Sequence, residues 1–125
     1  MKTEPSKAIC QAKHNECIAY LITQLSLSGF NPVLEKNKKA ASGHFYYDQL
    51  NLDDGFYLEL KTIGFLHNSE QALGDSTLCL YDEENEFYRL KFSIFTPLRL
   101  ESYDSLAESL ESTKSLKEAV FDAGY

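Results

Sequence analysis

The chain has 125 residues and a mass of 14.2 kDa, which is the size of one domain, so a single domain is predicted over residues 1–125. Hydrophobic residues make up 43% and charged residues 25%, which excludes the disordered and fibrous classes. The formal net charge of -7 argues against nucleic acid as a partner, because phosphate binding needs clustered lysines and arginines.

Cysteine usage and hydropathy indicate the compartment. The three cysteines, Cys10, Cys17 and Cys79, are an odd number and form no CxxC pair, which favours a reducing environment over a disulfide framework. No apolar run approaches the roughly 18 residues of a transmembrane helix, and no apolar signal core follows Met1. We therefore expect a cytoplasmic protein with no membrane partner.

The first predicted element is an amphipathic helix over residues 14–28, because apolar side chains recur there at helical spacing. They are Ile18, Leu21, Ile22 and Leu25. Gly29 stands where a glycine commonly ends a helix. Pro5 could lie in the first turn of an earlier helix, but the faces of 5–13 and 14–28 do not align, so residues 1–13 are predicted to be a flexible lead-in.

After Gly29 the apolar pattern changes to the period of two that is typical of strands. The predicted strands are 32–36, 44–52 and 56–63, separated by a loop over 37–43 and a turn over 53–55. In the third strand, one face is predicted to carry Phe56, Leu58, Leu60 and Thr62, and the other Tyr57, Glu59 and Lys61.

The second half of the chain predicts a short helix, a hairpin and a long helix. The short helix is placed within 65–75, and the hairpin joins strands 77–81 and 87–95 around a charged turn. The last helix is placed over 103–122, beginning at the capping box Ser105-Leu-Ala-Glu108. This order, α-β-β-β-(short α)-β-β-α, predicts an α+β fold with a mainly antiparallel five-stranded sheet flanked by N- and C-terminal helices.

One set of residues has the chemistry of a metal-dependent nuclease. Glu59 and Lys61 lie on a predicted strand, Asp48 precedes Glu59 by 11 positions, and Glu16 lies on the first helix. This set resembles the PD-(D/E)xK nuclease superfamily over about residues 14–63. The resemblance implies Mg²⁺ held by Asp48 and Glu59, with Lys61 stabilising charge on the attacked phosphate. The alternative, an ordinary exposed Glu-Lys pair on a solvated strand, is favoured, so no catalytic residue is assigned.

A second set could bind zinc. Cys10, His14 and Cys17 follow helical spacing and would share one stripe, but structural zinc sites usually have four ligands. Buried cysteines on an apolar face are the commoner explanation. No glycine-rich phosphate loop is present either, so no metal and no cofactor is predicted.

The element order resembles the class I effector chaperones of bacterial type III secretion over roughly residues 14–120. The similar segments are 58–66, 77–82, 87–95, 96–98 and the helix that contains Ser105 and Leu110. The resemblance implies a small, acidic, cytoplasmic homodimer that binds a secreted effector protein. The family's central helix helps to form the dimer, and the segment 65–75 is short for that purpose.

The uneven distribution of charge along the chain also favours a protein partner. Residues 1–40 hold six lysines and three acidic residues, whereas residues 41–125 hold six basic and sixteen acidic residues. Small acidic α+β proteins also serve as immunity proteins that block a basic toxin, and charge would steer that encounter. The acidic residues expected to bind a partner are Asp82, Glu83, Glu84, Glu86, Glu101, Asp104, Glu108 and Glu111. The sequence thus predicts a non-enzymatic protein-binding module, with the metal-dependent nuclease as the alternative from another class.

Overall fold

The computed structural model describes residues 7–39, 45–64, 73–96 and 98–122. Its elements are helix α1 (Lys7–Leu27), strands β1 (Val33–Lys39) and β2 (Phe45–Asn51), the 3-10 turn η1 (Asp53–Gly55), strands β3 (Tyr57–Ile63), β4 (Asp75–Tyr81) and β5 (Glu86–Ser93), and helix α2 (Leu100–Asp122).

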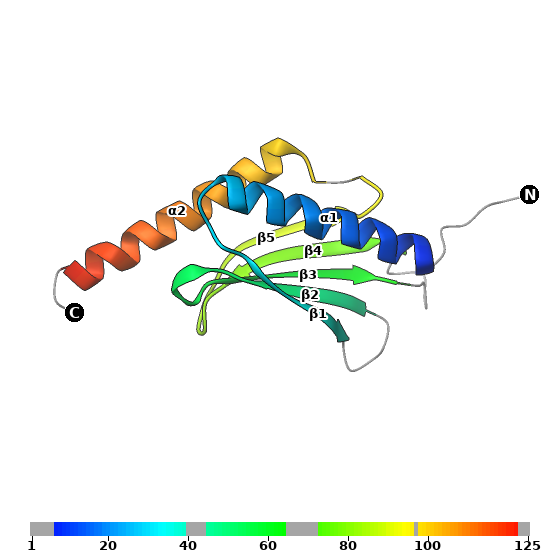
Figure 1. The fold of residues 1–125 in the computed structure, drawn as a ribbon, viewed down its shortest axis with the longest axis horizontal. Helices are drawn as coiled ribbons and strands as arrows, with labels where there is room; N and C mark the ends of the chain where they lie inside the picture. The colour runs from blue at the N-terminus through cyan, green and yellow to red at the C-terminus, as the bar shows by residue number, and fades with distance from the viewer. Residues whose placement is uncertain (1–6, 40–44, 65–72, 97, 123–125) are drawn as a thin grey trace, which may run out of the picture.

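The five strands form one antiparallel sheet in the order β1-β2-β3-β4-β5, so every strand pairs with its neighbour in the chain. Both helices lie on the same side of this sheet (Figure 1), with α1 packed over β3 and α2 over β5. The predicted α+β fold is confirmed. Most of the predicted short helix falls on residues 65–72, outside the described residues, and Asp75 already belongs to β4.

Helix α1 begins at Lys7, so the prediction of a flexible lead-in is wrong for residues 7–13. Its buried stripe is longer than the aliphatic residues indicated, because two cysteines and a histidine extend it toward the N-terminus. The buried residues are Cys10, His14, Cys17, Ile18, Leu21 and Leu25. The helix ends at Gly29 as predicted: Gly29 has a φ of 91°, and the Phe30 N–H donates to the Leu25 carbonyl at 3.0 Å.

The covered face of the sheet, the one beneath the helices, carries the core. Strand β3 alternates as predicted, with Leu58, Leu60 and Thr62 buried on this face. Their partners across β4 are Leu80, Leu78 and Ser76. Fully burying one such leucine contributes about 1.5–3 kcal/mol. The opposite face, which we call the open face, is covered by no described helix (Figure 1).

The end of β1 and the start of α2 differ from the prediction. Strand β1 continues through a bulge between Glu35 and Lys38 to Lys39, where a loop was predicted. Helix α2 begins at Leu100, and the Tyr103 N–H donates to the Arg99 carbonyl at 3.0 Å, so Ser105 lies inside the helix and caps nothing. The first two positions of the predicted apolar face, Tyr103 and Leu106, are buried.

Candidate functional site

The four residues of the nuclease alternative are not brought together. Asp48 is paired with Leu60 across the β2–β3 ladder, so its side chain lies on the covered face, where it is 6% exposed. Glu59 and Lys61 alternate with Leu60 and lie on the open face, with Lys61 Nζ 3.7 Å from Glu59 Oε1. Glu16 lies on the exposed side of α1 and pairs with Lys13 at 3.2 Å. The pleat separates Asp48 from Glu59, which corrects the expectation of a shared metal site.

Asp48 instead belongs to a polar network buried between α1 and the sheet. The imidazole of His14, which is fully buried, has Nε2 2.8 Å from Asp48 Oδ2 and Nδ1 2.6 Å from Thr62 Oγ1. The Thr62 hydroxyl lies 3.1 Å from Ser76 Oγ, and the Ser76 hydroxyl donates to the Gly74 carbonyl at 3.1 Å. One helix and three adjacent strands are therefore linked through a single histidine.

The hydrogens of this network can be assigned from its last bond. Because Ser76 donates to the Gly74 carbonyl, the Thr62 hydroxyl must donate to Ser76 Oγ, and the Thr62 oxygen is left to accept from His14 Nδ1. The contact between Nε2 of His14 and Oδ2 of Asp48 holds one hydrogen, carried by the ring or by the carboxyl group. All four contacts are satisfied together when Nδ1 carries a hydrogen and the His14–Asp48 pair as a whole has no net charge.

The order Asp48, His14, Thr62 matches that of an acid, base and hydroxyl nucleophile. Thr62 is 0% exposed and Ser76 is 4% exposed, so no substrate carbonyl can reach either hydroxyl in this structure. The hydroxyl of Thr62 also donates to Ser76 in the assignment above, which points its hydrogen away from the imidazole. The network fastens α1 to the sheet and has no geometry for catalysis.

This network was missed by the sequence reasoning, although a signal for it exists. Asp48 lies two positions from Leu50 and Thr62 two positions from Leu60, so each polar residue faces the same side of its strand as a core leucine. His14 lies at helical spacing from Cys10 and Cys17 on α1. A polar residue at a core position on several successive elements predicts a shared buried network, because each polar group needs a partner there. The residues that the structure describes hold no cluster of three or more side chains suited to a metal ion.

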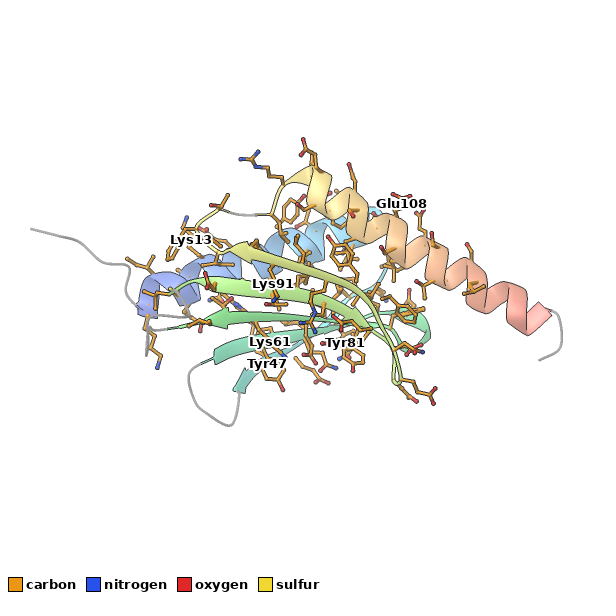
Figure 2. The ribbon with its side chains drawn as sticks, turned by 180° about the vertical axis from the view of Figure 1, so that it is seen from behind. Lys13, Tyr47, Lys61, Tyr81, Lys91 and Glu108 are labelled. Carbon is orange, nitrogen blue, oxygen red and sulfur yellow. The ribbon has the colours of Figure 1, made fainter. Side chains whose placement is uncertain are left out.

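The open face is polar and aromatic. It carries Tyr47, Gln49, Tyr57, Glu59, Lys61, Thr77, Cys79, Tyr81, Arg89 and Lys91, as the register of the four ladders places them. The rings of Tyr57 and Tyr81 stack across β3 and β4 with centroids 5.4 Å apart. Figure 2 shows Tyr47, Lys61 and Tyr81 on this face.

Cys79 lies at the centre of the open face but is only 3% exposed. Burial raises the pKa of its thiol above the ordinary 9.0, and the pKa of the neighbouring Tyr81 hydroxyl is raised by burial as well. A neutral, buried thiol is a poor nucleophile, so this cysteine supports no covalent chemistry.

The outer edge of β5 is unpaired among the described strands. The Asp82 N–H donates to the Asn85 carbonyl at one end of the β4–β5 hairpin, and the Ile94 N–H donates to the Gly74 carbonyl at the other. Antiparallel residues alternate between pointing their backbone groups at the partner strand and away from it. With Ile94 bonded to β4, the N–H and C=O groups of Arg89 and Lys91 point outward from the sheet edge.

The other edge strand, β1, has features that disfavour pairing with a further strand. It has a bulge between Glu35 and Lys38, and its sequence holds Lys36, Lys38 and Lys39. Bulges and lysines are the usual means by which an edge strand avoids pairing with another chain. β5 forms six continuous pairs from Leu80↔Tyr88 to Asp75↔Ser93, and its irregularity lies at the turn. The two sheet edges are therefore unequal as templates for a further strand.

Acidic residues predicted to bind a partner fall into two groups. Two have local roles: the Asp82 carboxylate accepts the N–H groups of Glu84 and Asn85, both at 2.8 Å, and Glu86 forms a bidentate pair with Arg89 at 2.7 and 3.1 Å. The Arg89 guanidinium lowers the pKa of the Glu86 carboxyl. These two carboxylates shape the hairpin turn.

The remaining acidic side chains are exposed. On α2 they follow the spacing i, i+3, i+7, i+10 and form one stripe, which we call the acidic stripe; Figure 2 labels one of its members, Glu108. The stripe consists of Glu101, Asp104, Glu108 and Glu111. Glu83 and Glu84 are exposed at the β4–β5 turn. Because Glu86 is exposed as well, the structure leaves seven of the eight predicted residues accessible to a partner.

Compared with protein-family models, curated proteins and solved structures, the chain matches none of them. Neither described helix is long and apolar enough to cross a membrane.

Proposed function

We propose that the protein is a non-enzymatic protein-binding module that receives an extended segment of another protein along the outer edge of β5. The observation that carries this proposal is the inequality of the two sheet edges: β1 has a bulge and lysines, whereas β5 presents the backbone groups of Arg89 and Lys91. Main-chain hydrogen bonds to an edge strand are a common way of binding extended peptides.

The side chains of β5 define the chemistry of that segment. Tyr88, Leu90 and Phe92 lie on the covered face and are only half-buried, so apolar side chains of an added strand would extend the core. Lys91 lies on the open face and makes no ion pair with a described residue, so an acidic or polar side chain suits the position opposite it. A segment that alternates apolar with acidic or polar residues fits best. A secreted effector held by a chaperone is one partner of this kind.

Pairing of two copies through β5 is less favourable than pairing with a different chain. A two-fold axis centred on Leu90 would place Arg89 of each copy opposite Lys91 of the other, and like charges in directly opposite positions destabilise a sheet. We therefore favour a hetero-complex at this edge. A homodimer, as the chaperone resemblance implies, would need another surface.

The acidic stripe supports a second candidate, an immunity-type inhibitor of a basic toxin. Its four carboxylates are exposed on one side of α2, and their negative electrostatic field would steer a basic partner to this surface. This candidate predicts association that slows markedly as salt rises. Three unpaired thiols make the cytoplasm the compartment we propose for either function.

The test is a selection of peptide ligands from a display library, followed by affinity measurements on matched variants. Arg89→Pro deletes one outward N–H, whereas Arg89→Ala deletes only the side chain and serves as the control. We expect Arg89→Pro to weaken binding of the selected peptide at least tenfold and Arg89→Ala to change it less than threefold. Equal loss in both variants, or a peptide lost only on reversing the acidic stripe, would favour the charge-steered inhibitor instead.

A further inference from the structure

A hollow of about 500 Å³ indents the sheet where β3, β4 and β5 run side by side. The ladder pairs Lys61 with Thr77 and Thr77 with Lys91, so these three residues form one row across the open face (Figure 2 labels both lysines). The lining of the hollow also includes Ile63 and Asp75, and parts of Ser76 and Phe92, whose side chains lie on the covered face.

The donors in this row are little used within the described chain. Lys91 makes no ion pair and the Thr77 hydroxyl no hydrogen bond with a described residue. Lys61 Nζ lies 3.7 Å from Glu59 Oε1, beyond hydrogen-bond distance, and its side chain is 47% exposed. Asp75 already has an interaction partner. The two ammonium groups outnumber the single carboxylate of Asp75 in the lining, so the hollow carries net positive charge in a protein whose net charge is -7.

We propose that this hollow binds a phosphate monoester of a small apolar group. The phosphoryl group would lie between Lys61 and Lys91 and accept the Thr77 hydroxyl, because two ammonium groups match a dianion better than the single charge of a carboxylate. The apolar body would rest on Ile63. The volume lies within the range of about 300–1,000 Å³ that is typical of small-molecule sites. This site goes beyond the strand-binding function and uses side chains rather than the β5 backbone.

The experiment is an NMR titration of the full chain with phenyl phosphate, inorganic phosphate and phenol. We expect saturable shifts at the backbone amides of the row with phenyl phosphate, weaker binding of inorganic phosphate, and none of phenol. The double variant Lys61→Ala/Lys91→Ala should bind phenyl phosphate at least tenfold more weakly. Lys13→Ala, which removes an exposed lysine on α1, should bind it as the unchanged protein does.

Three results would contradict the proposal. One is no saturation with phenyl phosphate up to about 10 mM, which corresponds to a binding free energy of only about 3 kcal/mol. Another is unchanged affinity in the double variant, with its amide spectrum showing that it is folded. Equal affinity for inorganic phosphate would overturn the assignment of an ester. Failure of this proposal is separable from failure of the strand-binding proposal, since Arg89→Pro should retain phenyl phosphate and Lys61→Ala, on the interior strand β3, should retain the selected peptide.

Discussion

Nε2 of His14 lies 2.8 Å from Oδ2 of Asp48, joining helix α1 to strand β2 across 34 positions of sequence. Both side chains are buried, and Nδ1 of the same ring continues the contact to Thr62 on β3. A histidine that bonds at both nitrogens has one orientation only, so it fixes the rotation and height of α1 over the sheet. Packing of Leu21 and Leu25 alone would specify that placement less sharply.

The first prediction concerns the stability of this pair. His14→Ala removes the imidazole that contacts the buried Asp48 side chain, so we expect a loss of about 3–5 kcal/mol in the free energy of unfolding. Asp48→Asn retains a hydrogen-bonding group of the same shape, and its loss should be about 1–2 kcal/mol. Urea unfolding of both variants measures the difference. Equal, small losses would show that the pair does not hold α1.

The second prediction concerns the hydrogens of the ring. The donor assignment requires Nδ1 of His14 to carry a hydrogen in the folded protein, and Asp48→Asn keeps this requirement, because its amide can donate to Nε2. Nitrogen-15 chemical shifts of the imidazole show whether Nδ1 is protonated in both proteins. An unprotonated Nδ1 in the unchanged protein would contradict the assignment.

The third prediction concerns alkaline pH. Burial raises the pKa of the Cys17 thiol to about 12 from 9.0, and raises those of the Tyr20 and Tyr88 hydroxyls above 10.0. The unfolded chain therefore loses these protons first, so the stability that they contribute is present below about pH 9 and is lost as the pH rises toward about 12. Urea unfolding at about pH 8 and about pH 11 should show this fall. Cys17→Ala should show a smaller fall in stability between the two pH values. A fall equal to that of the unchanged protein would show that Cys17 does not contribute to this pH dependence.

The fourth prediction concerns Gly74, which has a φ of 88° and supports both Ile94 and Ser76 through its carbonyl. A Cβ at this position would overlap the ring of Phe95, whereas one at Gly55, with a φ of 82°, would meet open space. Gly55→Ala should cost about 1–2 kcal/mol for the left-handed backbone alone. Gly74→Ala should cost clearly more in the same unfolding assay. Matching losses would mean that Phe95 moves aside freely.

The fold could be predicted because its signals are local. The period-two pattern of β3, the helical spacing of Ile18, Leu21 and Leu25, and the helix-ending Gly29 each depend on neighbours in the sequence. Where prediction failed, the deciding contact was distant. Residues 7–13 are helical because Cys10 and His14 are buried against the sheet.

The candidate site was harder to predict for the same reason. Whether Asp48 and Glu59 share a face depends on the register of β2 against β3, and that register pairs Asp48 with Leu60 rather than with Glu59. The outward direction of the Arg89 N–H likewise depends on the parity of the β4–β5 ladder. The acidic residues of α2 could be read from spacing alone, because an exposed helical stripe needs no partner strand.

The most direct test of the proposed function is amide hydrogen exchange along β5 with and without a selected peptide. In the free protein the amides of Arg89 and Lys91 should exchange rapidly, because they point outward, while those of Leu90 and Phe92 should be protected. With the peptide bound, the account predicts strong protection of Arg89 and Lys91. Continued rapid exchange at both amides in a saturated complex, with new protection only on α2 or the open face, would contradict it.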